Sequence, residues 1–505
     1  MKKNILDTRR CGVLIHPTSF PSPLGIGDLG AEARQILKQL ADAKVSLWQI
    51  LPLGPTGYGD SPYAARSTFA GNELLIDLRS LTELCPDDKL ASIAAKATGN
   101  CTGRVDYNWV YANKMPLLKD AAYVFSISDC DKSAYKTFCK ENAWWLDDYA
   151  LYQALANYNN DSRWFMWDDG LKLRKKSEIT KWTRKLSPEI ESYKILQYFF
   201  FTQWDSLHRF ANSLGIKIIG DIPIYVAGDS VDAWTNRNLF KIDESGFQTC
   251  QAGCPPDAFT EDGQLWGNPV YNWEEHKKDN YAWWEKRMEM TLRQVDVVRI
   301  DHFRGFESYW EVPAGDKTAR NGKWVPGPGM DLLKHFKGMN VIGEDLGFLT
   351  PAVIEMKKKS GFPGMKILQF AWDFRDGHYA TDNAYLPYNH EQNCIAYTGT
   401  HDNQTTRGWY NSLPDCYKDY VRRYFQCPDE DIVWQMIRGA LSSVANTAVI
   451  PMQDILGLDD SARMNLPSSV GSANWSWRYD PKDMQFWMLG RLREMITVYG
   501  REVIE

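Results

Sequence analysis

Several charged residues stand at the ends of short apolar runs, where a parallel-sheet protein carries its chemistry. The clearest run is residues 297–305 (VVRIDHFRG), which holds Arg299 and Asp301 two positions apart. Side chains two positions apart on a β-strand project from the same face, so we expect this guanidinium and carboxylate to lie side by side. A neighbouring cation lowers the pKa of a carboxylate and keeps it ionised as a nucleophile. A structural ion pair would use the same two residues, so this segment alone leaves both interpretations open.

Other acidic residues follow further apolar runs in the same way. One such residue could simply cap a helix, but carboxylates from several strands would converge on one mouth. Like charges in a cleft raise at least one pKa, so that one acid stays protonated while another stays ionised. Cleavage of a glycosidic bond needs this pair of states. The polar residues that end these runs are Asp221, Tyr225, Glu344, Asp345, His401 and Asp402.

A metal-dependent hydrolase is the alternative use of such carboxylates. It would normally add histidines at ligand spacing, and the chain has only eight histidines. His302 and His401 each adjoin an aspartate without a second ligand in register. The sequence therefore predicts no metal site.

The elements that must position these residues form a regular series. Residues 12–20 and 45–53 predict two strands around an amphipathic helix at 31–42, which is a βαβ unit with parallel strands. Eight such strands alternating with helices are typical of a TIM barrel. A doubly wound open sheet is the alternative, but PSPLGIGDLG after the first strand does not fit its Gly-rich phosphate loop. The remaining predicted strands are 216–226, 295–305, 339–347, 364–373, 393–406 and 446–458.

Two long segments interrupt the series, and we expect them to be insertions in a single catalytic domain spanning residues 1–505. Residues 54–213, after the second strand, are mostly helical and rich in aromatic residues, and end in a barrel helix. Residues 227–294, after the third strand, are dense in Gly, Pro and aromatic residues and end in another barrel helix. Long loops of this kind are typical of lids over a binding site. No separate C-terminal β domain is expected.

Composition excludes several classes of partner. A net charge of -6 with 24% charged residues gives no basic surface for nucleic acid and no polybasic membrane patch. The first residues lack the apolar stretch of a signal peptide, and no transmembrane span is expected. Ten cysteines without regular spacing do not indicate a disulfide framework, so we expect a cytoplasmic protein. Cys250 and Cys254 are expected to be free thiols on a loop.

The motifs along the chain resemble those of the amylomaltases, the disproportionating 4-α-glucanotransferases related to the α-amylase clan. The resemblance runs from near the start to near the end of the chain, in the order found in the family. The matching segments are GPTGYGDSPY (54–63), GDIPIYV (220–226), PPDAFTEDGQLWGNP (255–269), RIDHFRG (299–305), GEDLG (343–347), GTHDNQTTRGW (399–409) and RMNLPS (463–468).

The resemblance implies a role for each matching residue. Asp301 is the expected nucleophile, oriented and kept ionised by Arg299, and Glu344 is the general acid and then base. Asp402 is the third carboxylate, which holds sugar hydroxyls in the transition state. The other expected glucan contacts are His401, Asp221, Tyr63, Ser61, Asp257, Gln264, Trp266 and Asn465, with Tyr58 as part of a secondary glucan site.

The expected activity is transfer of α-1,4-glucan segments between maltooligosaccharides, by a retaining double displacement that needs no cofactor or metal ion. Because Glu344 follows the apolar pair Val341 and Ile342, desolvation should raise its pKa, as a general acid requires. An α-glucan hydrolase would use the same carboxylates, so they leave that alternative open. A catalytically inactive glucan-binding protein is disfavoured because all three carboxylates are present. No obligate protein partner is evident.

Overall fold

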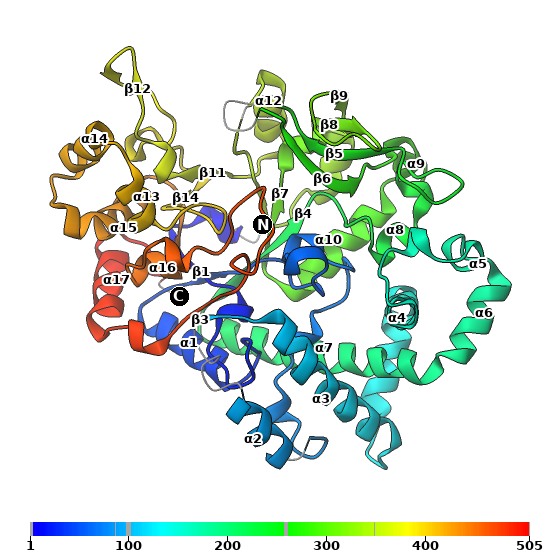
Figure 1. Ribbon diagram of the computed structural model, residues 1–505. Coiled ribbons are helices and arrows are strands. Elements are labelled where there is room, and N and C mark those ends of the chain that lie inside the picture. The colour runs from blue at the N-terminus through cyan, green and yellow to red at the C-terminus, as the bar shows by residue number, and fades with distance from the viewer. Residues whose placement is uncertain (1–3, 86, 97–102, 257–260, 348, 504–505) are drawn as a thin grey trace.

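Eight parallel strands form a barrel at the centre of the computed structural model, which describes residues 4–85, 87–96, 103–256, 261–347 and 349–503 (Figure 1). Their order in the sheet is β10-β7-β4-β2-β1-β15-β14-β11, which is the chain order of the predicted series once the ring is closed. The predicted TIM barrel and its eight strands are thus confirmed, although each strand is shorter than expected. The strands are β1 Arg10–Leu14, β2 Leu47–Gln49, β4 Lys217–Pro223, β7 Val297–Asp301, β10 Val341–Gly343, β11 Gly364–Ile367, β14 Cys394–Tyr397 and β15 Thr447–Pro451.

The junction between β10 and β11 is closed by individual hydrogen bonds rather than by a ladder. The Gly343 N–H donates to the Pro363 carbonyl at 3.0 Å. The buried Asp345 carboxylate accepts from the Met365 N–H at 2.7 Å and pairs with Lys357 at 2.8 Å. Asp345 therefore connects the end of β10 to β11. The prediction that it joins the other acids at the mouth is wrong.

Helices surround this sheet where apolar residues recur at helical spacing. In α1 (Ala31–Asp42), Ala33, Ile36, Leu37 and Leu40 are all buried, which fixes this helix on the barrel wall. The helix α12 begins at Pro351, where the Thr350 hydroxyl caps the Val353 N–H. The other helices outside the two long segments are α11 Met330–Leu333, α13 Thr406–Ser412, α14 Asp415–Phe425, α15 Ile432–Ser442, α16 Met452–Ile455 and α17 Phe486–Val498; α12 ends at Ser360.

Long helices occupy most of residues 54–213 and extend to one side of the barrel (Figure 1). Trp145 on α4 packs against Phe201 on α7, with ring centroids 5.8 Å apart. These aromatic contacts continue the barrel core into the helical segment. Its helices are α2 Asp87–Lys96, α3 Tyr107–Ile127, α4 Ser133–Asn159, α5 Asp169–Lys172, α6 Lys176–Lys185 and α7 Ser187–Ser213.

A four-stranded antiparallel sheet lies over the ends of β4 and β7, in the order β6-β5-β8-β9. It joins β5 (Cys250–Cys254) and β6 (Gln264–Pro269) to β8 (Ser308–Pro313) and β9 (Lys323–Pro326). Cys250 is a free thiol, and both Cys250 and Cys254 stand on a strand and not on a loop. Among the described residues, no helix is long and apolar enough to cross a membrane. The helices of residues 227–294 are α8 Val231–Thr235, α9 Trp273–Lys278 and α10 Ala282–Gln294. Two short strand pairs lie outside both larger sheets. One joins β3 (Gly103–Arg104) to β16 (Trp477–Arg478), and the other joins β12 (Phe374–Arg375) to β13 (His378–Tyr379).

Candidate active site

Three carboxylates meet at the C-terminal mouth of the barrel. Asp301 is the last residue of β7, and Glu344 directly follows the neighbouring strand β10. The Glu344 N–H donates to the Ile300 carbonyl at 3.0 Å, which places Glu344 beside the end of β7. Asp402 comes from the turn after β14, across the barrel. Asp301 and Asp402 keep 30% and 43% of their side chains exposed, so both can reach a substrate.

A buried guanidinium, that of Arg299, holds two carboxylates at once. Its Nη2 donates to Asp301 Oδ1 at 2.9 Å, which confirms that the two side chains share a strand face. Its Nη1 contacts both oxygens of Asp221, at 2.7 and 2.6 Å. The Asp221 side chain is 0% exposed, so it lies beneath the mouth rather than open to a sugar. The geometry makes Asp221 the anchor of Arg299.

Sharing Arg299 changes the expected electrostatics of Asp301. Burial raises the pKa of Asp301, and Arg299 acts in the opposite direction. The negative charges of Asp221 and Asp402 raise the pKa further. Arg299 thus lowers the pKa of Asp301 as expected, but burial and the neighbouring negative charges outweigh it and leave the pKa above its usual value. Burial is the largest of these effects, and the charge of Asp221, which shares Arg299, adds to it.

Glu344 sits in the environment that a general acid requires. Burial, followed by the nearby negative charge of Asp301, raises the pKa of Glu344 to about 7. Both of its oxygens accept backbone hydrogen bonds at 2.7 Å, from the N–H groups of His302 and Leu346. His302 adopts a left-handed backbone conformation with φ of 53°, which turns its N–H toward Glu344. Glu344 is thereby held in one position and can carry a proton at neutral pH.

This raised pKa predicts the pH dependence of the reaction. If Glu344 must be protonated in the free enzyme, kcat/KM should fall as pH rises through about 7, by about tenfold for each pH unit well above that value. The decline follows from loss of the acid form, since the protonated fraction decreases as pH increases. Initial rates of glucose release from maltotriose between pH 5 and 9 measure it. A flat profile up to pH 9 would contradict the role of Glu344.

Asp402 lies in an environment with the opposite effect. Burial acts to raise its pKa, but the charge and hydrogen bond of His401 outweigh this and hold the pKa well below its usual range. His401 Nε2 lies 3.3 Å from Asp402 Oδ2, and Asn465 Nδ2 donates to Oδ1 at 2.6 Å. The Arg463 Nη2 donates to the Asp402 backbone carbonyl at 2.6 Å. Asp402 therefore stays ionised while Glu344 holds a proton.

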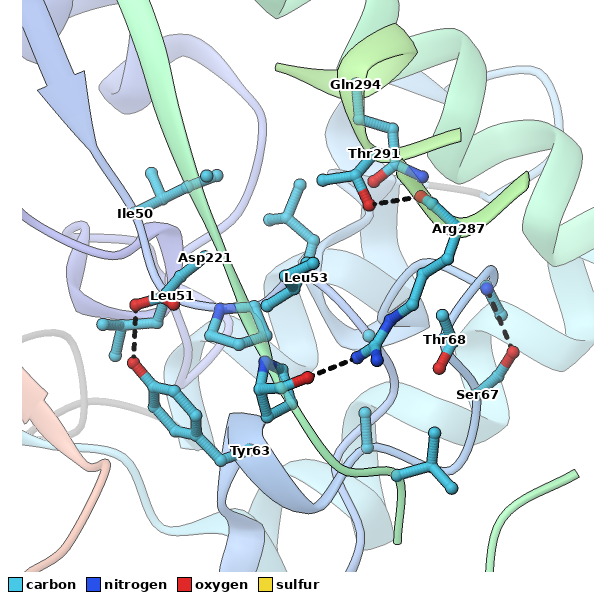
Figure 2. Close-up of a pocket in the computed structure, with 18 of the residues that line it drawn as sticks. Ile50, Leu51, Leu53, Tyr63, Ser67, Thr68, Asp221, Arg287, Thr291 and Gln294 are labelled. Atoms are coloured by element: carbon cyan, nitrogen blue, oxygen red, sulfur yellow. Dashed lines mark hydrogen bonds between the residues drawn. The ribbon is translucent and has the colours of Figure 1, made fainter. Parts of the chain in front are cut away.

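Tyr63 links two parts of the mouth from the loop after β2. Its hydroxyl donates to Asp221 Oδ2 at 2.8 Å, as Figure 2 shows, and its ring stacks on His401 with centroids 5.2 Å apart. The Ser61 hydroxyl accepts from the Tyr63 N–H at 3.2 Å and so fixes the turn that carries this ring. Tyr58, on the same loop, is 74% exposed and makes no contact with the carboxylates.

Behind this hydrogen bond lies a small cavity of about 60 Å³, drawn in Figure 2. The buried Arg287 lines its far side and donates to the Pro223 and Ile224 carbonyls at 2.5 and 3.0 Å. These carbonyls lie at the end of β4, two and three residues past Asp221. Arg287 thereby fixes the strand end that anchors Arg299.

Replacing Tyr63 by phenylalanine tests the stacked side chain. The variant keeps the ring on His401 but leaves Asp221 with one hydrogen bond fewer, and a hydrogen bond to a charged group contributes about 1.5–3 kcal/mol. We expect kcat/KM for maltotriose to fall roughly ten- to a hundredfold. Steady-state kinetics, with the melting temperature as a check on folding, measure the effect. A variant within twofold of wild type would show that the hydroxyl positions nothing.

The antiparallel sheet contributes two of the predicted contacts. Trp266 and Gln264 stand on β6, where Trp266 Nε1 donates to Gln264 Oε1 at 3.1 Å. The Trp266 ring packs edge to face on His302, the residue after Asp301, at 4.8 Å. Asp257 lies outside the described residues. The predicted lid is thus attached to a regular sheet that reaches His302, the residue after Asp301.

One predicted feature of the mouth differs from the structure. Tyr225 is buried and stacks on Tyr271 at 5.9 Å, so it belongs to the core and not to the mouth. Burial lowers the pKa of His302 to about 3, so its ring is neutral. Among the described residues, no group of three or more His, Cys, Asp or Glu side chains is arranged to hold a metal ion.

Sequence reasoning missed three residues that support the mouth. The Trp475 ring lies 5.9 Å from His401 and 5.6 Å from Tyr63, and closes this cluster from the C-terminal part of the chain. His16 Nδ1 accepts from the Leu51 N–H at 3.2 Å, and burial lowers its pKa to about 3. Arg463 stood in a quoted motif without a role. No local pattern marks Trp475 or His16, whereas the two-residue spacing of Arg463 from Asn465 was a usable signal.

A barrel that brings an aspartate, a glutamate with a pKa of about 7 and a third, ionised carboxylate to one mouth has the residues that cleavage of a glycosidic bond needs. Comparison with known proteins agrees. Residues 15–484 match the family described as 4-alpha-glucanotransferase. The chain is 44% identical to a 4-alpha-glucanotransferase from Synechocystis sp., over 99% of each chain, and 44% identical to one from Clostridium butyricum, over 96% of this chain and 100% of that protein.

Solved structures give the same result. The amylomaltase from Streptococcus agalactiae in complex with acarbose superposes with a TM-score of 0.93 at 36% identity, covering 98% of this chain and 100% of that one. The amylomaltase from Corynebacterium glutamicum shares the fold, with a TM-score of 0.75 at 18% identity. The chain belongs to the 4-alpha-glucanotransferase family.

Proposed function

We propose that this chain transfers α-1,4-glucan segments between maltooligosaccharides through a covalent glucosyl-enzyme intermediate. The observation that carries the proposal is the pairing of Glu344, whose pKa is raised to about 7, with Asp301 at the end of the adjacent strand β7, where Asp301 accepts a hydrogen bond from Arg299. An acid and a nucleophile on neighbouring strand ends are what a double displacement requires. The reaction uses no cofactor or metal ion.

In the first step, a carboxylate oxygen of Asp301 attacks the anomeric carbon while Glu344 gives its proton to the departing 4-oxygen. The glycosidic bond breaks and an ester to Asp301 forms. Esterification removes the negative charge that helps to raise the pKa of Glu344, so this pKa falls and Glu344 becomes a base. In the second step, Glu344 takes the proton of an acceptor 4-hydroxyl, whose oxygen displaces Asp301.

The surrounding residues position the sugar and its attacker. Asp402, with His401 and Asn465, presents an ionised carboxylate to the sugar hydroxyls as charge develops. Arg299 orients Asp301, and Asp221 acts by holding Arg299. The other proposed glucan contacts are Tyr63, Ser61, Gln264, Trp266 and Asp257, and Tyr58 is proposed as part of a secondary glucan site.

Water exclusion would decide between transfer and hydrolysis. The Trp266 ring on β6 packs on His302, and its Nε1 donates to Gln264. Both side chains are thus placed to shield the intermediate from water until an acceptor binds. We also propose a cytoplasmic location and a single-domain catalytic chain whose two long insertions, residues 54–213 and 227–294, shape the glucan path.

Incubation with maltotriose alone tests the proposal. Transfer should give glucose and a ladder of longer oligosaccharides, with almost no net gain in reducing ends. Chromatography of the products and a reducing-end assay on the same samples measure both quantities. Reducing ends that rise with every cleavage would reject transfer in favour of the alternative, an α-1,4-glucan hydrolase.

A further inference from the structure

A pocket of about 260 Å³ is lined by residues of the loop after β2 and of the helices α3, α4 and α7, and by none of the three carboxylates. Figure 1 shows where these helices lie. The volume of this pocket suits a small molecule. We call it the insertion pocket. Its polar lining includes Arg66, Glu73, Tyr111, Lys119, Gln153 and Tyr193.

Two cations face this pocket without an ion pair in the described part of the chain, although the negative charges of Asp229 and Glu73 lie near enough to act on Arg66. Within the described part of the chain, the guanidinium of Arg66 donates no hydrogen bond, and its Nε is fully buried. Lys119 makes no ion pair there, and its Nζ lies 5.5 Å from the ring centroid of Tyr193. A buried, unpaired guanidinium is costly unless a partner of opposite charge arrives.

The carboxylate in the lining does not supply that charge. Glu73 is buried and accepts hydrogen bonds from the Tyr149 hydroxyl and from Gln197 Nε2, the latter at 2.8 Å. It forms no ion pair with Arg66 or Lys119. Two positive side chains therefore face one carboxylate that is already bound, and the pocket favours an anion.

A second unpartnered group indicates what else the ligand carries. Gln153 is 6% exposed and donates from Nε2 to the Tyr149 hydroxyl at 3.1 Å, but its buried Oε1 receives no hydrogen bond. An acceptor in this state needs a donor such as a hydroxyl. The Tyr193 hydroxyl accepts from Asn157 Nδ2 at 2.6 Å, which leaves its own proton free to donate.

We propose that the insertion pocket binds a hexose monophosphate. Arg66 and Lys119 hold the phosphate, because a guanidinium pairs with phosphate oxygens through two parallel hydrogen bonds. A sugar hydroxyl donates to Gln153 Oε1, and another accepts from Tyr193. The site is separate from the three carboxylates and uses residues of the loop and the helical insertion only.

Calorimetric titration of the full-length protein with glucose 6-phosphate and with glucose 1-phosphate tests this site. At least one of them should bind saturably at one site per chain. Arg66→Gln and Lys119→Gln should each raise Kd about tenfold or more, since each removes a charge-assisted contact. Lys136→Gln is the matched control, because it removes an exposed lysine of α4 outside the pocket, and its Kd should equal that of wild type.

Glucose and inorganic phosphate are titrated in parallel and should each bind at least tenfold more weakly than the better hexose phosphate. Lys119 is only half-buried on α3, so its variant tests the site even if Arg66→Gln fails to fold. Absence of saturable binding by both hexose phosphates would overturn the proposal. So would a Lys119→Gln variant that binds as wild type does, or inorganic phosphate that binds as tightly.

Discussion

Replacing Asp301 by asparagine is expected to abolish transfer, with kcat on maltotriose falling roughly 10⁴-fold or more. The amide cannot form the ester to the anomeric carbon. It still presents an oxygen to Arg299 Nη2, which now lies 2.9 Å from Asp301 Oδ1, so the shape of the mouth should be kept. We therefore expect the Kd for maltotriose to stay within a few-fold of wild type. Product chromatography measures turnover, and calorimetry with the inactive variant measures binding.

The same variant should also change Glu344. Because the charge of Asp301 contributes to the raised pKa of Glu344, its removal should lower that pKa from about 7. Titration of the labelled Glu344 carboxyl by NMR measures the shift. Asp415→Asn is the matched control, since it removes an exposed carboxylate at the start of α14, and neither its kcat nor the pKa of Glu344 should move. Asp301→Asn turnover near wild type would reject Asp301 as the nucleophile.

The barrel and its mouth were predictable because both follow from local periodicity. Arg299 and Asp301 lie on one strand face by the two-residue period, and parallel strands bring their carboxyl ends together wherever they lie in the chain. Asp301 and Glu344 therefore lie at neighbouring strand ends, as expected. Asp345 shows the limit of this logic, because the same period turns the next residue away from the mouth, where it binds Met365 and Lys357.

The antiparallel sheet over the mouth could not be predicted in the same way. Its strand β5 pairs with β6 nearby in sequence but also with β8, after the barrel strand β7. Such pairing depends on a partner more than fifty residues away, and the Gly- and Pro-rich sequence of residues 250–269 gives no regular alternation.

The division of roles between Asp221 and Asp301 could not be predicted from the sequence either. Asp221 and Asp301 are both acids at strand ends, and sequence alone does not tell which one is buried. Only the structure shows that Asp221 takes both hydrogen bonds of Arg299 Nη1 and leaves one bond, from Nη2, for Asp301. This division separates the anchor, Asp221, from the proposed nucleophile, Asp301, although both are aspartates.

Replacing Glu344 by glutamine should impair both steps, with kcat on maltotriose falling roughly 10³- to 10⁵-fold. The amide can neither protonate the departing oxygen nor accept a proton. Its NH₂ group also faces one of two backbone N–H donors, those of His302 and Leu346, so one hydrogen bond is lost. We expect that mismatch to cost about 1–3 kcal/mol of folding stability. Thermal unfolding measures this cost separately from activity.

A fluoride donor separates a role in proton transfer from a structural role for Glu344. Fluoride leaves without protonation, so the Glu344→Gln variant should form the intermediate from α-maltosyl fluoride at a rate closer to that of wild type. Added azide needs no general base, and it should restore turnover by attacking the face of the sugar opposite Asp301. Because the intermediate is β-linked to Asp301, the product must be the α-glycosyl azide. A β-azide, or no rescue with a folded variant, would contradict the double displacement, since only attack on a β-linked ester returns the α configuration.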